Sequence, residues 1–251
     1  MYEPHPIFTQ PDDEDVRVWR YMDFTKLVSL LDSRRLYFTR ADNFDDPFEG
    51  SLPRINVQAR QQVPSDIAKE ARQAFAEAMA KLGDVNRQLP RCHAINCWHM
   101  NEYESAAMWK LYLKSDEGIA VQSTYRKFRS SLIDEEKIFV GVVRYIDYET
   151  EWIAAGNLLT PFVHKRKSFE HEREVRAVVT KWPVSENGMD FTKDTIVGGL
   201  KIRVDLELLI EQVFVAPSSP SWFADLVRAV IQRYGYSFPV VQSKLNEQPL
   251  F

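Results

Sequence analysis

The apolar positions of the first forty residues alternate between the periods of strands and helices. Residues 24–31 carry apolar side chains at helical spacing directly after Asp23, whose side chain can cap a helix. A short strand is predicted over residues 35–39. The chain therefore opens as strand, helix and strand around Arg20.

Two further stretches predict helices. An alanine-rich run over residues 65–82 places its apolar residues on one face, and Gly83 stands just past its end. Asn101 precedes a second helical pattern, and Glu104 follows three residues later, which is the spacing of a capping box. We expect a long helix before Gly83 and a second helix after Asn101.

The second half of the chain has the composition of strands. Helices over residues 206–211 and 222–234, the second capped by Ser221, interrupt the series. Strands are expected over residues 138–145, 175–180, 195–204 and 213–216.

Length and composition fit one globular domain. The chain has 251 residues, of which 45% are hydrophobic and 27% charged, enough for one core. Residues 1–15 are acidic and lack periodic apolar positions, so they predict a flexible arm before a single domain over residues 16–251. The predicted class is α+β, with a mixed or antiparallel sheet, several flanking helices and one aromatic, charged cleft.

The charge balance excludes some classes of protein. A net charge of −4 disfavours a protein that coats nucleic acid or an anionic membrane, because such binding needs clustered positive charge. No apolar stretch approaches the roughly 20 residues that span a bilayer, and the first fifteen residues lack the regions of a signal peptide. We expect a cytoplasmic protein with no membrane partner.

Two short segments hold residue types that bind metals. Cys92 and Cys97 are five apart, so in a strand they face opposite sides, and their spacing is not that of a zinc loop. The four acidic residues within 42–49 could bind magnesium, but Asp46 before Pro47 more readily forms an Asx turn. We expect buried structural cysteines, a turn and no bound metal.

Four clusters crowd aromatic rings against ionisable groups, at residues 19–21, 43–50, 98–112 and 169–176. Such crowding is costly in a core unless the polar atoms are paired, so the clusters predict one pocket. In this order and spacing they resemble the bacterial family known as domain of unknown function 2971, over about residues 18–234. That resemblance implies a single fold but no activity.

Aromatic side chains near the second predicted helix form one candidate for binding. His99, Trp109 and Tyr112 make a wall on which a flat ring such as nicotinamide or adenine can stack. The alternative is a helix that packs on the core, with Glu104 as a capping residue.

The segment that ends the third quarter of the chain carries most of the candidate chemistry. If the strand there starts early, Glu172, Glu174 and Arg176 share one face. Two close carboxylates repel each other, so at least one pKa should be raised unless Arg176 neutralises the pair. The alternative is a solvated strand end with salt bridges.

A second resemblance concerns chemistry. Arg20 between aromatic residues, Ser123 and Thr124 at a strand end, and Glu172-x-Glu174 occur in the order used by the mono-ADP-ribosyltransferases, which the chain resembles through them. The resemblance implies that NAD is the substrate, that Arg20 pairs with its phosphates and that Ser123 orients the catalytic carboxylate. That carboxylate would stabilise the oxocarbenium-like centre as nicotinamide leaves.

The predicted site therefore has two parts. Glu174 is expected to face the cleft and to contribute little to stability. Arg20, Trp109, Tyr112 and Arg176 are expected to line one cleft. The catalytic candidates are Glu174, Glu172 and Arg20, and the residues expected to contact NAD are Tyr21, His99, Trp109, Tyr112, Ser123 and Arg176.

Other functions stay open at this point. The acceptor of a transfer reaction could be protein, nucleic acid or water. A different class is a non-catalytic module that holds a nucleotide or a partner's peptide, for example in phage defence. A metal-dependent nuclease using Asp46, Glu49, Glu172 and Glu174 is disfavoured by the acidic balance of the chain.

Overall fold

The computed structural model describes residues 1–112, 116–154, 156–186 and 188–249. A nine-stranded sheet organises this part of the chain, with the path β11-β2-β3-β1-β4-β12-β13, while β8 pairs with β3 and β5 pairs with β8. Only β12 and β13 are parallel, so the sheet is mixed and the predicted α+β class is confirmed. The strands are β1 (Arg17–Asp23), β2 (Arg35–Arg40), β3 (His93–Met100), β4 (Gly118–Thr124), β5 (Ile138–Val142), β8 (Glu174–Thr180), β11 (Gly199–Arg203), β12 (Gln212–Val215) and β13 (Val240–Gln242).

Helices and two small sheets surround the main sheet. The small sheets pair β6 (Arg144–Ile146) with β7 (His164–Arg166), and β9 (Val184–Ser185) with β10 (Gly188–Met189). The helices are α1 (Phe24–Ser33), α2 (Arg54–Gln61), α3 (Arg72–Gln88), α4 (Ala106–Tyr112), α5 (Tyr125–Ser130), α6 (Leu206–Leu209) and α7 (Ser221–Arg233). Short 3-10 turns are η1 (Ala41–Asn43), η2 (Lys69–Ala71), η3 (Leu89–Cys92), η4 (Thr160–Val163) and η5 (Lys167–Glu172).

The central strand β3 has a gap along one edge. Its other edge pairs with β8 over the whole stretch from His93 to His99. The gapped edge pairs with β2 at Ala94 and Ile95, and with β1 only at His99 and Met100. Because β1 turns away to pair with β4 along its full length, the sheet splits beside the middle of β3.

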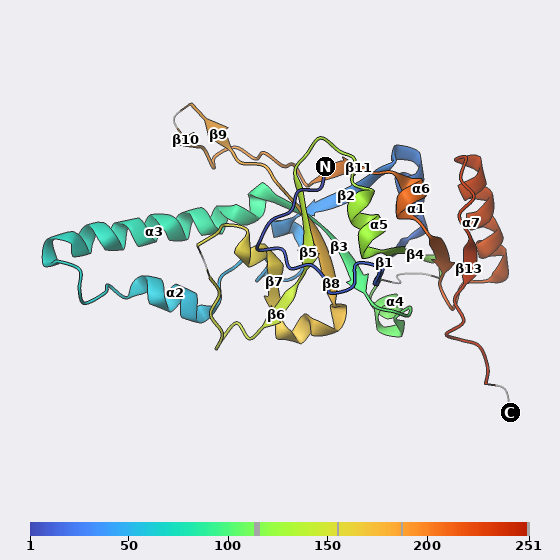
Figure 1. Cartoon of the computed structure of the whole chain (residues 1–251), viewed down its shortest axis with the longest axis horizontal. Helices are drawn as coiled ribbons and strands as arrows, with labels where there is room; N and C mark the ends of the chain where they lie inside the picture. The colour runs from blue at the N-terminus through green and yellow to red at the C-terminus, as the bar shows by residue number, and fades with distance from the viewer. Residues whose placement is uncertain (113–115, 155, 187, 250–251) are drawn as a thin grey trace.

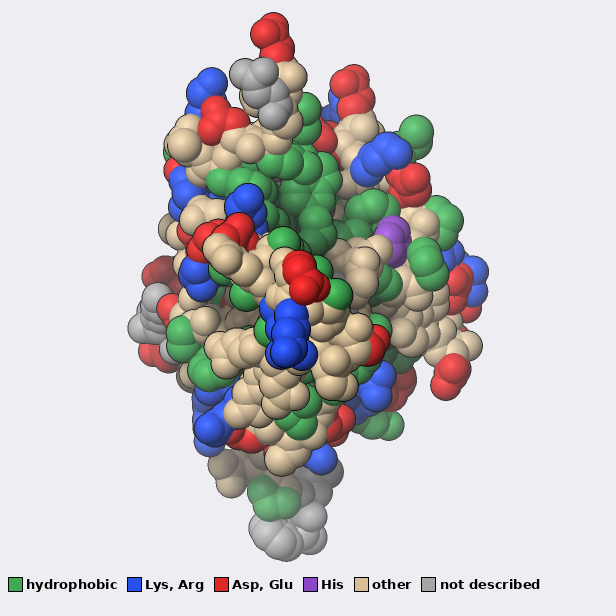
Figure 2. All heavy atoms as spheres, turned by 90° about the vertical axis from the view of Figure 1, so that its left-hand side faces the viewer, with side chains coloured by type: hydrophobic (Ala, Val, Ile, Leu, Met, Phe, Trp, Pro, Cys, Tyr) green, Lys and Arg blue, Asp and Glu red, His purple; other side chains and the backbone are tan. Residues whose placement is uncertain are grey.

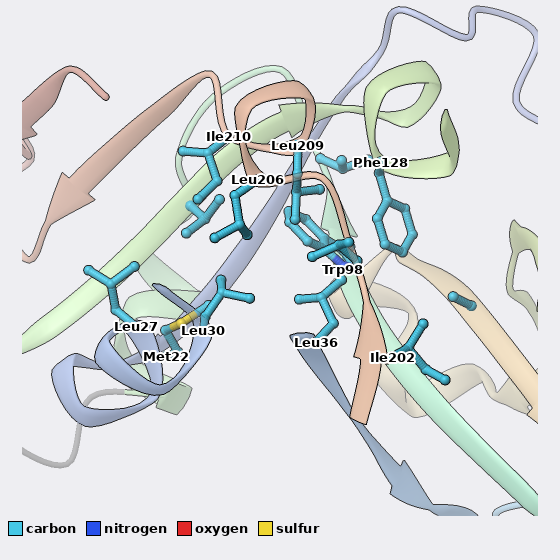
Figure 3. Packing of buried hydrophobic residues seen from close by; sticks show 14 of the residues in the cluster. Met22, Leu27, Leu30, Leu36, Trp98, Phe128, Ile202, Leu206, Leu209 and Ile210 are labelled. Atoms are coloured by element: carbon cyan, nitrogen blue, oxygen red, sulfur yellow. The ribbon is translucent and has the colours of Figure 1, made fainter. Parts of the chain in front are cut away.

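The largest apolar cluster lies under α1, α5, α6 and α7 (Figure 3). Leu27 and Leu30 from α1 and Leu206 and Leu209 from α6 pack there against strand residues such as Trp98. Burying each such side chain contributes about 1.5–3 kcal/mol, so this layer holds the helices to the sheet.

Helices α2 and α3 form an arm that projects from the opposite side of the molecule (Figure 1). Helix α3 confirms the predicted long helix but runs past Gly83 to Gln88, because a glycine inside a helix costs only about 1 kcal/mol. None of its residues is fully buried, and Val85 near its C-terminal end packs against the apolar cluster that contains Leu89 and Phe162. Seen from the arm, acidic and basic side chains are interspersed around it (Figure 2).

The first fifteen residues pack against β5 instead of forming the expected loose arm. Tyr2 bridges to Ile138, and the backbone N–H of Val142 donates to Thr9 at 2.8 Å. Phe8 is 3% exposed and lies 5.5 Å from the ring of Phe139. A few apolar side chains, such as Phe8, are sufficient to pack this segment against β5, although they do not recur at a regular spacing in the sequence.

The residues expected to cap the helices were predicted correctly only in part. The side chain of Asp23 accepts from the N–H of Lys26 and caps α1, as predicted. The proposed capping box is wrong, because α4 begins at Ala106 and the Ser105 hydroxyl accepts from the N–H of Met108 at 3.3 Å. Ser221 is the first residue of α7 and makes no cap, since Pro220 occupies the cap position.

Two of the predicted strands have other bounds in the structure. The run over residues 138–145 forms β5 and β6, which belong to different sheets. The run over residues 195–204 shortens to β11. In the described ranges, no helix is long and apolar enough to cross a membrane.

Gly50 provides a test of the loop that joins the second sequence cluster to the core. Its φ is +71°, and a Cβ there would lie 2.4 Å from the ring of Phe162. Gly50→Ala should therefore lower the free energy of unfolding by at least about 2 kcal/mol in denaturant titrations. Gly83→Ala is the matched control, because a Cβ at Gly83 meets nothing within 4 Å and should stabilise α3 by up to about 1 kcal/mol. Equal stability of the two variants would contradict this account of Gly50.

Candidate functional site

A cleft of about 540 Å³ opens where the sheet splits, which is a volume typical of small-molecule sites. Its walls come from α1, β1, β2, β3, α4 and the start of β8, together with η5 and the loop after η1. Six of the predicted site residues line it: Arg20, Tyr21, His99, Tyr112, Glu172 and Glu174.

Two side chains bridge the split in the sheet. Asn96 on β3 donates from Nδ2 to the carbonyl oxygen of Tyr37 on β2 at 2.8 Å. Arg20 on β1 donates from its guanidinium to the carbonyl oxygen of Cys97 at 2.5 Å. Side chains thus replace the backbone ladder at this edge, and the space beside them becomes the cleft.

The guanidinium of Arg20 has no acidic partner within 4 Å among the described residues. Burial lowers its pKa from the ordinary arginine value, which still leaves it a cation at neutral pH. A partly buried cation without a counter-charge favours an anionic ligand, because the ligand then supplies the missing charge.

The two predicted glutamates meet at the opposite wall through one lysine. The ammonium group of Lys165, on β7, donates to Oε2 of Glu172 and, at 2.9 Å, to Oε1 of Glu174. Arg173 between the glutamates has a φ of +42° and ends η5, so β8 begins only at Glu174. Glu172 therefore reaches Lys165 from η5 and not from β8.

A fully buried arginine completes this arrangement. Nε of Arg176 donates to Oε2 of Glu174 at 2.6 Å. Its two terminal nitrogens donate to the two carboxylate oxygens of Glu49 at 2.6 and 2.8 Å, and one of them also donates to the carbonyl oxygen of Phe162. Because both oxygens of Glu174 are occupied, Glu174 is held as a structural carboxylate.

The environments separate the pKa values of the two glutamates. Burial, followed by the hydrogen bond and charge of Glu174, raises the pKa of Glu172 to about 7. Burial alone would also raise the pKa of Glu174, but the charges of Arg176 and Lys165 hold it well below its usual range. Glu172 is thus the member of the pair that can exchange a proton near neutral pH.

His99 fixes the backbone beside Glu172. Its Nδ1 lies 2.6 Å from the carbonyl oxygen of Glu172, so Nδ1 carries the proton and donates. Burial lowers the pKa of His99, which keeps the ring neutral at pH 7. His99 also lies opposite Glu174 in the backbone pairing of β3 with β8, so it adjoins both glutamates.

Aromatic rings cover the wall formed by α4. The rings of Tyr21 and Tyr112 are nearly parallel, with centroids 6.3 Å apart and an angle of 22°. Trp109 lies behind them, edge-on to Tyr21 at 5.0 Å, and donates to Glu104. Tyr112 is 48% exposed and offers a free face to a flat ligand, whereas Trp109 is 2% exposed and supports the wall.

Three predicted contact residues lie outside the lining of the cleft. Trp109 and Arg176 stand directly behind its walls and act through Tyr21 and Glu174. Ser123 is fully buried on β4, which flanks β1 on the side away from β3 and β8. It cannot orient the glutamates from there, and His99 occupies the position next to them.

Sequence reasoning missed several residues of the site. Lys165 stood within a charged segment, but nothing in the sequence showed that it would bridge two carboxylates. Tyr37, which is 47% exposed, lines the cleft from β2. Three exposed cations, Lys26, Arg35 and Lys201, line the end of the cleft near α1 and β11, and only the pairing of β11 with β2 brings Lys201 there.

Three of the four acidic candidate metal ligands pair with arginines: Asp42, Asp46 and Glu49. Asp46 pairs with Arg166 at 2.7 Å and accepts from the N–H of Phe48, which confirms the predicted Asx turn. Cys92 and Cys97 are free thiols. Among the residues with a described position, no three His, Cys, Asp or Glu side chains form a group that could hold a metal ion.

Comparisons with known proteins give a distant structural similarity. No family model matches the chain, and no curated protein matches it, so the resemblance to domain of unknown function 2971 stays a prediction. The chain is similar to Thermus sp. 2.9 DarT in complex with NAD+, with 9% identity, a TM-score of 0.43 and coverage of 94% of this chain and 98% of that chain. For Thermus sp. 2.9 DarT in complex with ADP-ribosylated ssDNA the identity is 10%, the TM-score 0.42 and the coverage 94% and 97%. At this distance, function has to be argued from the side chains.

The burial of Glu174 changes what its substitution should do. Sequence reasoning expected a nearly intact fold, but Glu174 is 6% exposed and its loss leaves Arg176 and Lys165 short of a counter-charge. Glu174→Gln should therefore lower the free energy of unfolding by about 3 kcal/mol or more at pH 7. Because the pKa of Glu174 is depressed in the folded chain, the loss should shrink as the pH falls below about 4.3.

The matched control is Glu170→Gln, which removes an exposed carboxylate from the same turn. Denaturant titrations at several pH values compare the two variants. A Glu174→Gln variant as stable as Glu170→Gln would contradict the structural role of Glu174.

Proposed function

We propose that this chain is an enzyme that cleaves the bond between nicotinamide and ribose in NAD and transfers ADP-ribose to an acceptor. The observation that carries the proposal is the meeting of Arg20, an unpaired cation, with the Glu172 carboxyl in one cleft beside Tyr112. NAD contains the matching groups: an anionic diphosphate, a ribose with hydroxyl donors and two flat rings.

The cationic groups fit the diphosphate. Arg20 has unused donors on its guanidinium, and planar guanidinium groups bind phosphate oxygens in pairs. Lys26, Arg35 and Lys201 extend the positive charge along the rim toward α1. The acidic wall is at the Glu172 end, so a bound dinucleotide would place its phosphates at Arg20 and a ribose at Glu172.

Glu172 suits the chemistry at that ribose. When the C1′–N bond breaks, its electron pair goes to the ring nitrogen of nicotinamide and positive charge develops on the ribose. A Glu172 carboxylate would stabilise that charge and then take the proton that the acceptor releases as its oxygen or nitrogen bonds to C1′. Glu174, held by Lys165 and Arg176, keeps Glu172 in place.

A non-catalytic module that only holds a nucleotide remains the competing function. If the buried ion pairs of Glu174 serve only the stability of the fold, they favour this non-catalytic function. Binding of NAD without any release of nicotinamide would select that function over catalysis.

Release of nicotinamide from NAD tests the proposal directly. Wild-type protein should release it, and Glu172→Gln should reduce the rate by about two to three orders of magnitude while NAD still binds. Arg20→Gln should weaken NAD binding, whereas Arg17→Gln on the exposed start of the same strand is the matched control. Wild-type protein that neither binds NAD nor releases nicotinamide with protein, nucleic-acid or water acceptors would refute the proposal.

The pH dependence of the rate gives a separate test. Because the carboxylate form of Glu172 is the active form and its pKa is about 7, the rate should rise as the pH increases through 7 and then level off. A rate that falls over this range would show that the protonated form acts, and Glu172 would then be a general acid.

A further inference from the structure

Five charged groups form one continuous buried chain between the loop after η1 and the cleft. Glu49 pairs with Arg176, Arg176 with Glu174, Glu174 with Lys165, and Lys165 with Glu172. The charges alternate in sign along the chain. Arg176 is fully buried, and the side chain of Glu49 is 2% exposed, so water screens this end of the chain very little.

The charge balance of this chain depends on one proton. With all five groups ionised, three carboxylates face two cations, which leaves one negative charge in excess. The balance becomes neutral when one carboxyl keeps its proton. Glu172 is at the open end, and Lys165 is its one cationic partner among the residues that the structure describes. It is also the most exposed of the three carboxyls, so it is the one that takes the proton.

We propose that Glu49 is a positioning residue that, through Arg176 and Glu174, determines whether Glu172 carries a proton. The inference deepens the proposed function and rests on the role given there to Glu172. Glu49 does not touch a ligand in the cleft, because Arg176 and Glu174 stand between it and Glu172. Its part is to neutralise Arg176. Arg176 then adds no net positive charge beside Glu174 and Glu172.

The other groups near Glu172 do not change this balance at neutral pH. Tyr145 and Tyr112 have pKa values raised by burial and stay neutral, and the pKa of His99 is lowered by burial. The other cations that line the cleft with Glu172 are Arg20, which donates to the carbonyl oxygen of Cys97 on β3, and the exposed Lys26, Arg35 and Lys201 at the end near α1 and β11. Arg173 and His171 next to Glu172 are exposed.

The other ionisable groups around Glu49 also keep their charge state at neutral pH. Burial raises the pKa values of Tyr148 and Cys97, which both sense the charge of Glu49, so neither ionises at neutral pH. Arg166 on β7 is already neutralised by Asp46. Glu49 is therefore the carboxylate whose removal leaves Arg176 with excess charge.

The test follows the carboxyl group of Glu172 directly, by carbon-13 NMR titration of ligand-free protein labelled at glutamate. Glu49→Gln keeps the shape of the side chain but removes its charge, so the midpoint of Glu172 should fall by about one unit. Glu49→Asp, which restores the charge, should return the midpoint toward 7. Asp42→Asn removes a carboxylate from η1, outside the chain of five, and its partner Arg40 keeps Asp194 as a second carboxylate, so the midpoint should stay unchanged.

A double variant covers the case in which Glu49→Gln does not fold. Glu49→Gln with Arg176→Met removes one charge of each sign, and such replacements of a buried pair are often tolerated. Its Glu172 midpoint should stay near 7. An unchanged midpoint in folded Glu49→Gln, an equal shift in Asp42→Asn, or a fallen midpoint in the double variant would each overturn the proposal.

Turnover then separates this inference from the proposed function. If wild-type protein releases nicotinamide, the rising limb of its pH profile should move to lower pH in Glu49→Gln by the same amount as the NMR midpoint. If it does not, the proposed function fails, yet the titration still decides whether Glu49 controls the proton on Glu172.

Discussion

The neutralisation of one buried arginine determines how this site is built. Arg176 has no access to solvent, and an unpaired charge in that position would cost several kcal/mol. Glu174 neutralises it from the same strand, and Glu49 neutralises it from the loop after η1. The carbonyl oxygen of Phe162 in η4 accepts a further hydrogen bond from it. The loop after η1 is thereby held to β8, although Glu49 lies 127 positions before Arg176 in the sequence.

The split of the sheet is the second element of the site. A strand that turns away from its neighbour leaves backbone groups unpaired, and such groups need other partners. Arg20 and Asn96 supply donors across the gap, so the chain can keep an opening in the middle of its main sheet. The opening places a cation on one side and the Glu172 carboxyl on the other, which a closed sheet would have kept apart.

The sequence predicted local features better than long-range ones. The cap at Asp23 and the turn at Asp46 followed from short-range rules, because each depends on neighbours in the chain. The position of Ser123 could not be predicted, because it depends on which side of β1 the strand β4 occupies. Lys165 shows the same limit, since its bridge between two glutamates follows from the pairing of β6 with β7 and from the left-handed turn at Arg173.

The central claim is that Arg20 and Glu172 bind two parts of one dinucleotide. A crystal structure with a non-cleavable NAD analogue tests it most directly. The analogue should lie in the gap between β1 and β3, with its diphosphate on the guanidinium of Arg20 and the ribose next to nicotinamide within hydrogen-bonding distance of Glu172. Density for the analogue elsewhere on the protein, or an empty cleft at saturating concentration, would contradict it.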